Sequence, residues 1–244
     1  MVSSHLFESA MRHALNLALN GPAYGINPQV GAVVLDPEGK VISEGWHMGS
    51  GTPHAEIVAL ENAKEQFGFQ SAFPPGYSAV VTLEPCNHTG KTGPCSQALL
   101  DAGISRVVYA SNDPGEDSSG GGKFLKKHGV EVVKGLLKSE ADDQARHWIV
   151  STKKQRPFIT IKYASTLDGR GAAQDGSSQW ISGPESRADS HRRRSEVDAI
   201  LVGTGTAIFD DPELTARGPD GSYFEHQPIR VIVGERDLPK NLKV

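Results

Sequence analysis

The amino-acid sequence predicts an α/β protein made of two domains. Up to about residue 148, apolar runs of strand length alternate with segments whose apolar residues recur at helical spacing. The first two strand-like runs are joined by the turn Pro-Glu-Gly, and a polar stretch ending in proline, 151–157, follows the last helical segment as a connector. Because alternating strands and helices build a sheet with helices on its faces, we expect one domain over 1–150 and another over 157–244.

The first domain is expected to begin with a helix, because residues 1–21 alternate apolar and polar side chains at helical spacing. The glycine-rich patch at 117–122 is expected to be a mobile loop. The other segments predict strands at 29–36, 40–46, 77–84, 105–111 and 130–135, helices at 54–67 and 95–102, and a polar helix after 135.

The second domain is expected to be a partial one. Residues 158–164, 199–203 and 229–234 have the composition of buried strands. An open parallel sheet needs crossover helices on both faces, and the last of these strands is followed only by 235–244. We therefore expect 157–244 to be the N-terminal part of a truncated α/β domain.

Composition and charge argue against several classes of protein. The mean hydropathy is −0.36 and no apolar run approaches the length of about 18 residues that a membrane span requires. The net charge of −4 is opposite to that of a broad nucleic-acid-binding surface, and on charge alone the basic run at 191–194 is typical of a solvated helix face. Because no basic segment followed by an apolar one begins the chain, we expect a cytoplasmic protein with reduced thiols.

Both cysteines of the chain, Cys86 and Cys95, follow a proline, and so does His54. In a reducing compartment, a close pair of cysteines is more often a metal or redox site than a structural disulfide. Proline is favoured in the first turn of a helix, so we expect His54 and Cys95 at helix N-termini. One histidine and two cysteines form a three-ligand tetrahedral zinc set with a fourth position open to water, which is the arrangement of a catalytic zinc site.

Glu56, two residues after His54, would supply the acid–base group of such a site. Attack on an amidine-like carbon needs a group that takes a proton from water and delivers protons to the ring nitrogen and the departing ammonia. Side chains two residues apart diverge in the middle of a helix, so this role requires His54 to lie at the helix end. The alternative is a closed structural zinc site with His88 as the fourth ligand, which would leave Glu56 without a task.

These motifs carry a family resemblance. The sequence HAE, followed by Pro-Cys and a further cysteine, is similar to the signature of the cytidine-deaminase superfamily, although eight residues rather than two separate the cysteines here. Together with INPQVGAVV and GWHMGSGTPHAE, the longer PCNHTGKTGPC resembles the bifunctional riboflavin-biosynthesis deaminase/reductase family. The segments KYASTLDGR, SSQWIS and TGTAIFDDPELTAR resemble the start of the reductase domain of that family.

The resemblance implies a cytidine-deaminase-like three-layer α/β/α domain followed by an incomplete dihydrofolate-reductase-like α/β domain. The first would use zinc to deaminate diaminohydroxyphosphoribosylaminopyrimidine, and the second is of the type that reduces 5-amino-6-(5-phosphoribosylamino)uracil with NADPH. We expect little reductase activity, because the late glycine-rich motif that this family uses for NADPH is absent from the sequence. The resemblance also implies a phosphorylated pyrimidine as substrate, no nucleic-acid or membrane partner, and a homo-oligomer.

Family carry-over, residue by residue, names further site residues. In the deaminase pocket these are Asn27, His47, His88 and Lys91. In the second domain the residues near NADPH are Ala164, Trp180, Thr206 and Asp210, and those near the sugar phosphate are Lys162, Ser178, Arg194, Leu214 and Arg217. Two arginines suit a phosphate ester, because a guanidinium binds it through a bidentate pair of hydrogen bonds.

Two other functions use the same residues. A deaminase of another nucleobase or nucleoside, such as tRNA adenosine, shares the zinc chemistry, but the acidic balance and the long cysteine spacing argue against it. A non-catalytic binding module held together by zinc would keep its ligand binding after Glu56→Ala.

Overall fold

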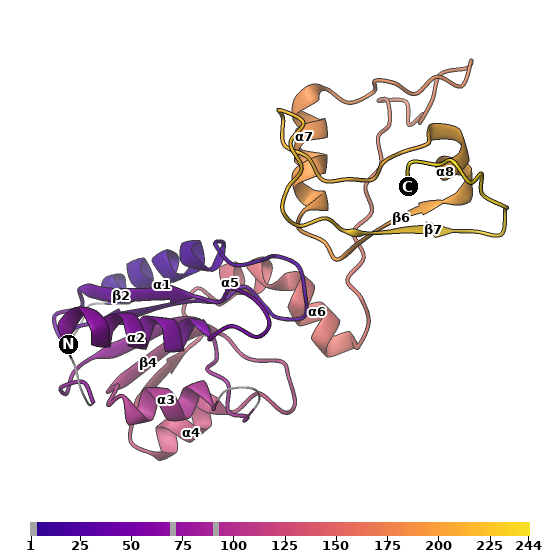
Figure 1. The fold of residues 1–244 in the computed structure, drawn as a ribbon. Helices are drawn as coiled ribbons and strands as arrows, with labels where there is room; N and C mark the ends of the chain where they lie inside the picture. Colours follow the sequence, from indigo (N-terminus) through magenta and orange to yellow (C-terminus); the bar gives the residue numbers. More distant parts are fainter. Residues whose placement is uncertain (1–3, 69–71, 90–92) are drawn as a thin grey trace. The chain divides into compact units, whose positions relative to one another are not determined.

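The computed structural model describes residues 4–68, 72–89 and 93–244. The chain divides into two compact units, Met1–Phe158 and Ile159–Val244, and each is described by itself (Figure 1). None of the described helices is long and apolar enough to cross a membrane.

A five-stranded sheet with the strand order β2-β1-β3-β4-β5 forms the centre of the first unit. The strand β1 pairs antiparallel with β2 and with β3, whereas β3–β4 and β4–β5 are parallel pairs. In chain order the elements are α1 (Ser4–Ala18), β1 (Gly31–Leu35), β2 (Val41–Trp46), α2 (Ala55–Phe67), β3 (Ser78–Leu83), α3 (Cys95–Asp101), β4 (Arg106–Ser111), α4 (Gly121–Lys127), β5 (Glu131–Lys134), α5 (Lys138–Gln144) and α6 (Arg146–Lys154).

Helices cover both faces of this sheet (Figure 1). Successive strand residues point to opposite faces, so Val80 packs with α1 and α5 while its neighbour Val81 packs with α2, α3 and α4. Both faces are therefore apolar, as parallel strands between two helical layers require. The three-layer α/β/α arrangement confirms the fold class predicted for the first domain.

The backbone of β2 approaches α2 closely and so fixes the position of the start of that helix. A Cβ atom built on Gly45 would lie 2.5 Å from the carbonyl oxygen of Ala55 and 2.6 Å from the backbone nitrogen of Ala59. Only glycine fits this contact, because a methyl group would push helix and strand apart. The helix start that carries His54 and Glu56 is thereby held directly against the sheet.

In the second unit a two-stranded parallel sheet is formed by β6 (Ala199–Gly203) and β7 (Ile229–Val233). Two helices, α7 (Pro184–Arg194) and α8 (Thr204–Asp210), flank β6 in the sequence. The expectation of a buried strand at 158–164 was wrong: this segment has no strand, and Ile161 is 81% exposed. A strand needs a hydrogen-bonded neighbour, and within the described residues 158–164 pairs with neither β6 nor β7.

Three further expectations needed correction. The strands β6 and β7 are only partly buried, because a sheet of two strands leaves much of its surface uncovered. The helix α6 runs into the expected connector as far as Lys154 and ends where Gln155 adopts a left-handed backbone, since its serine, threonine and lysines are compatible with a helix. In the glycine-rich patch, Gly121 and Gly122 are not loop residues but the buried first turn of α4.

Candidate metal centre

Three side chains from separate elements meet at one point of the first unit. His54 is the residue that caps α2, Cys86 lies just after β3, and Cys95 is the first residue of α3. The His54 Nδ1 atom lies 3.6 Å from Cys86 Sγ and 3.2 Å from Cys95 Sγ. All three ligand atoms lie within 4.8 Å of one another, and within the described residues no fourth histidine, cysteine or carboxylate joins this group.

The spacing of these atoms suits a tetrahedral ion. Zinc lies about 2.3 Å from sulfur and about 2.0–2.1 Å from imidazole nitrogen, so a tetrahedron places its ligand atoms roughly 3.5 Å apart. The observed separations of 3.2 and 3.6 Å match that value. The backbone N–H of Cys95 also donates to Cys86 Sγ over 3.4 Å, as it would to a thiolate ligand.

Electrostatics within the cluster favour a thiolate at Cys86. Its pKa is lowered to about 4, first by the hydrogen bond from the thiol of Cys95 and then by the hydrogen bond with His54. The same hydrogen bond, together with burial, raises the pKa of Cys95, and the pKa of His54 is raised by its hydrogen bond to Cys86. Cys95 therefore keeps its proton in the free protein, and a metal ion would displace that proton on binding.

Glu56 lies in the first turn of α2, only 5% exposed, where its carboxylate contacts the thiol of Cys95. Burial, and then the charge of Cys86, raise its pKa to about 7, so the carboxyl group can accept and donate protons near neutrality. His54 has an extended backbone, with φ −72° and ψ 158°, and is not inside the helix. The two side chains therefore reach the same centre although they are two residues apart.

Two of the predicted pocket residues adjoin the cluster. The His47 ring lies 5.2 Å from the His54 ring, centroid to centroid and nearly perpendicular to it. His47 Nδ1 donates to the carbonyl oxygen of Pro53 over 3.0 Å, which leaves Nε2 to accept from Asn27 Nδ2 over 2.8 Å. Burial lowers the pKa of His47, so this neutral tautomer is favoured.

The residues between the two cysteines are only partly described. His88 is half-buried, and its Nδ1 atom has no hydrogen-bond partner within the described part of the chain. A buried nitrogen of this kind needs a partner, which a bound molecule can supply. Lys91 lies outside the described residues.

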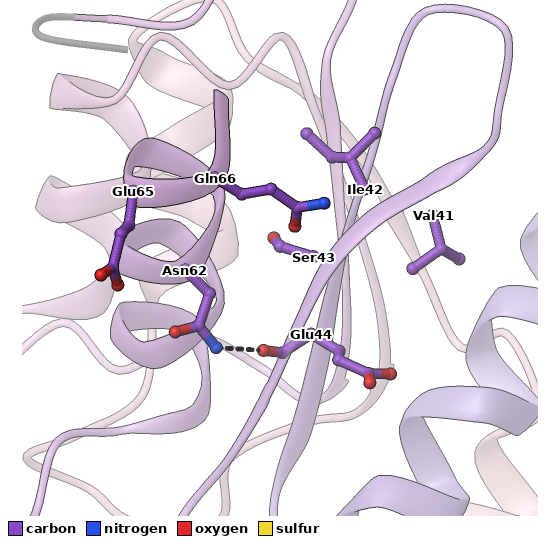
Figure 2. Close-up of a pocket in the computed structure, with 7 residues that line it drawn as sticks. All are labelled: Val41, Ile42, Ser43, Glu44, Asn62, Glu65 and Gln66. Atoms are coloured by element: carbon purple, nitrogen blue, oxygen red, sulfur yellow. Dashed lines mark hydrogen bonds between the residues drawn. The ribbon is translucent and has the colours of Figure 1, made fainter. Parts of the chain in front are cut away.

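A hollow of about 470 Å³ lies elsewhere in the first unit (Figure 2). It is bordered by the edge strand β2 and the C-terminal half of α2, at the opposite end of that helix from Glu56. Asn62 Nδ2 donates to the carbonyl oxygen of Glu44 over 2.9 Å and so occupies one backbone acceptor of the edge strand. The lining residues are Val41, Ile42, Ser43, Glu44, Asn62, Glu65 and Gln66, none of which is a predicted site residue.

In the second unit, two of the predicted residues come together, and a third lies in the sequence between the residues that they contact. Arg194 Nη1 donates to the carbonyl oxygen of Thr215 over 3.0 Å, and its pKa is lowered by burial and by the charge of Arg217. Arg217 pairs with Glu213 at 3.2 Å, and Leu214 is buried at 4% exposure. This arrangement places two guanidinium groups near each other, which favours an anion between them.

The other six predicted residues of this unit are not gathered at that point. Trp180 is 71% exposed and stacks on Arg187, whose guanidinium lies 4.4 Å from its ring. Within the described residues, none of the six shares a hydrogen bond or ion pair with Arg194 or Arg217. The remaining five are the exposed Lys162, Ser178, Thr206 and Asp210 and the partly buried Ala164.

Two residues that the sequence did not indicate support the arginine pair of the second unit and the His54 cluster of the first. His191 donates from Nδ1 to the same carbonyl oxygen of Thr215 that Arg194 contacts, and its position one helical turn before Arg194 was the available signal. In the first unit the charge of Asp113 contributes to the raised pKa of His54, although nothing in the sequence around Asp113 indicated that proximity.

Comparison with known families matches each unit separately. Residues 5–111 match the model of the cytidine and deoxycytidylate deaminase zinc-binding region, and residues 157–244 match the model of the RibD C-terminal domain.

Individual proteins match across both units. The riboflavin biosynthesis protein RibD of Mycobacterium tuberculosis is 47% identical over 89% of this chain and 62% of its own length, and that of Escherichia coli is 37% identical over 94% and 64%. The crystal structure of a diaminohydroxyphosphoribosylaminopyrimidine deaminase/5-amino-6-(5-phosphoribosylamino)uracil reductase from Thermotoga maritima has a TM-score of 0.85 and 40% identity, over 93% of this chain and 63% of that one. The chain thus spans less than two thirds of the length of these relatives.

Proposed function

The chain belongs to the RibD family of riboflavin-biosynthesis proteins, and on that premise we propose that its first unit is a zinc-dependent deaminase of diaminohydroxyphosphoribosylaminopyrimidine. The observation that carries the proposal is a three-ligand cluster with a buried carboxyl group beside it. A structural zinc site would need a fourth protein ligand and would have no use for Glu56.

His54, Cys86 and Cys95 would hold the zinc ion. When bound, zinc lowers the pKa of a water molecule towards neutrality and so supplies a nucleophile that free water does not provide. The protein contributes the three donor atoms already gathered at tetrahedral spacing, together with a neighbouring carboxyl group whose pKa is about 7.

Glu56 would move the protons of the reaction. It accepts a proton from the attacking water, donates it to the adjacent ring nitrogen, and then transfers the second proton of the water to the leaving amino group. The carbon–nitrogen bond breaks, ammonia departs, and the water oxygen remains on the pyrimidine as a carbonyl. The balance is one water consumed and one ammonia released, with no redox change.

The pocket residues would orient the phosphorylated pyrimidine. The amide nitrogen of Asn27 is held by His47, and its oxygen would accept a hydrogen bond from the heterocycle. His88 offers its unpartnered Nδ1 atom, and Lys91 would supply a point charge for the phosphate.

The second unit would bind NADPH and the sugar phosphate of the deaminated product, 5-amino-6-(5-phosphoribosylamino)uracil. Arg194 and Arg217 are its best-supported residues, because their two guanidinium groups suit a phosphate ester. Lys162, Ser178 and Leu214 would complete the sugar-phosphate site, and Ala164, Trp180, Thr206 and Asp210 would contact NADPH. We further propose a cytoplasmic homo-oligomer, a setting in which the two cysteine ligands stay reduced.

Product analysis in heavy-oxygen water tests the deamination proposal. The zinc-loaded chain should convert the diaminopyrimidine to the uracil product and incorporate one heavy oxygen per ammonia released. Cytidine and a tRNA containing adenosine at its wobble position serve as comparison substrates and should remain unchanged. Turnover of the tRNA without turnover of the pyrimidine would instead support the nucleic-acid deaminase.

A further inference from the structure

A buried carboxylate, Glu84, stands two residues before the ligand Cys86. Its side chain is held by backbone amides: Oε1 accepts from Gly122 N–H over 3.1 Å, and Oε2 accepts from Asp113 N–H over 3.3 Å. The residue is 9% exposed, and none of the ion pairs among the described residues includes it. Burying a carboxylate without a cation is costly, so these two hydrogen bonds must compensate for much of its lost hydration.

The segment from Asp113 to Gly122 wraps around the turn that carries Cys86. The backbone N–H of Asn87 donates to the carbonyl oxygen of Ser118 over 2.8 Å. A Cβ atom on Gly121 would lie only 1.9 Å from the carbonyl oxygen of Pro85. Contacts from this segment therefore fix the residues immediately before and after Cys86.

The start of α4 also depends on Glu84. Its N-cap residue, Gly120, has no side chain with which to satisfy the free amides of the first turn, and Glu84 accepts one of them, from Gly122. A Cβ atom on Gly122 would lie 3.3 Å from Glu84 Oε1 and 2.8 Å from the hydroxyl of Tyr109. The glycines thus let the helix approach closely enough for its amide to reach the carboxylate.

We propose that Glu84 is a positioning residue for the metal centre: by binding the Asp113 and Gly122 amides, it fixes the backbone that places the Cys86 sulfur opposite His54 and Cys95. The inference rests on the proposed zinc site and adds to it a residue that touches neither metal nor substrate. Groups that orient metal ligands in this way typically change metal affinity or activity by about 10–100-fold when they are replaced.

Glu84→Gln tests this role with little change in size. A glutamine offers one acceptor oxygen and one amide donor, so in either orientation one of the two backbone amides loses its acceptor. Glu61→Gln removes the same charge from an exposed position of α2 and is the matched control. If the glutamine variant does not fold, Glu84→Asp, which keeps the charge but shortens its reach, serves for the same comparison.

Zinc affinity is measured by competition with a chelator, and ligand geometry by the visible absorption of the Co²⁺-loaded protein, both well below the unfolding temperature. We expect Glu84→Gln to bind zinc about 10–100-fold more weakly and to alter the Co²⁺ spectrum, while Glu61→Gln matches the unchanged protein. A lower melting temperature with unchanged zinc affinity and an unchanged spectrum would overturn the proposal. Neither readout needs the substrate, so a failure of the proposed deamination would be recognised separately.

Discussion

At the scale of single residues, the proposed deamination depends most on Glu56. It is buried beside a thiolate, and the same surroundings that make its charge costly bring its pKa to about 7. A glutamine at this position keeps the shape but can neither accept nor release a proton in this range.

We predict that Glu56→Gln binds one zinc ion per chain, as the unchanged protein does, but loses deamination by about 100- to 10,000-fold, the usual contribution of general acid–base catalysis. Ammonia release and metal content measured on the same sample check this. Activity near that of the unchanged protein would rule out Glu56 as the proton carrier.

Lys91→Ala tests substrate recognition. If the long cysteine spacer serves to bind the phosphate, this variant should lose far more kcat/KM on the phosphorylated pyrimidine than on its dephosphorylated counterpart, because only the first offers an anion to the lysine. Equal losses on both substrates would show that Lys91 does not bind the phosphate.

The candidate metal ligands could be predicted from the sequence because histidine and cysteine are chemically distinctive residues. Glu84 and Asp113 were not predicted as supporting residues. Their contacts join positions 29 to 38 residues apart in the sequence, through backbone amides that every residue type possesses. Only the fold brings those amides together.

At the scale of elements, the packing of β2 against α2 holds in place the helix end that carries His54. A methyl group on Gly45 would lie 2.5 Å from a helix carbonyl oxygen, and neither backbone can yield without moving the helix that begins at His54. We therefore expect both stability and zinc binding to depend on this one contact.

We predict that Gly45→Ala lowers the free energy of unfolding by about 1–3 kcal/mol, the usual cost of overpacking, and also weakens zinc binding. Denaturant melts and chelator competition measure the two effects. Gly171→Ala is the control, because a methyl group there would meet open space in the other unit. A fully stable Gly45→Ala variant with unchanged zinc affinity would contradict the coupling.

Most element types in the first unit followed from sequence periodicity, because the central strands β1, β3 and β4 contribute residues to both buried clusters and α1, α2 and α3 each place apolar residues in one of them. The helix α4 was not predicted at all. Its first residues, Gly121 and Gly122, were assigned to a loop because glycine is a poor helix former, but they allow the close approach to Pro85 and Tyr109. Contacts between elements overrode local propensity there.

At the scale of the whole molecule, the first unit has a core of its own. Both of its buried clusters lie within residues 10–141, and its sheet pairs all five strands internally. In the second unit, alternating apolar residues at 158–164 misled the strand prediction, because periodicity records which faces could be buried and not whether a partner strand is present.

We predict that a fragment of residues 1–158 folds, binds one zinc ion and deaminates the pyrimidine with the kcat of the full 244-residue chain. Circular dichroism, metal analysis and ammonia release on the two proteins check this. A fragment that folds and binds zinc but does not turn over would show that residues 159–244 contribute to the deaminase site.

The proposed deamination depends most on zinc held by His54, Cys86 and Cys95, and titration of zinc into the metal-free chain tests this most directly. We predict that the rate of ammonia release from the diaminopyrimidine rises linearly and levels off at one zinc ion per chain, while Cys86→Ser stays flat over the same range. Full activity without metal, or a chain that binds one zinc ion and releases no ammonia, would contradict the account.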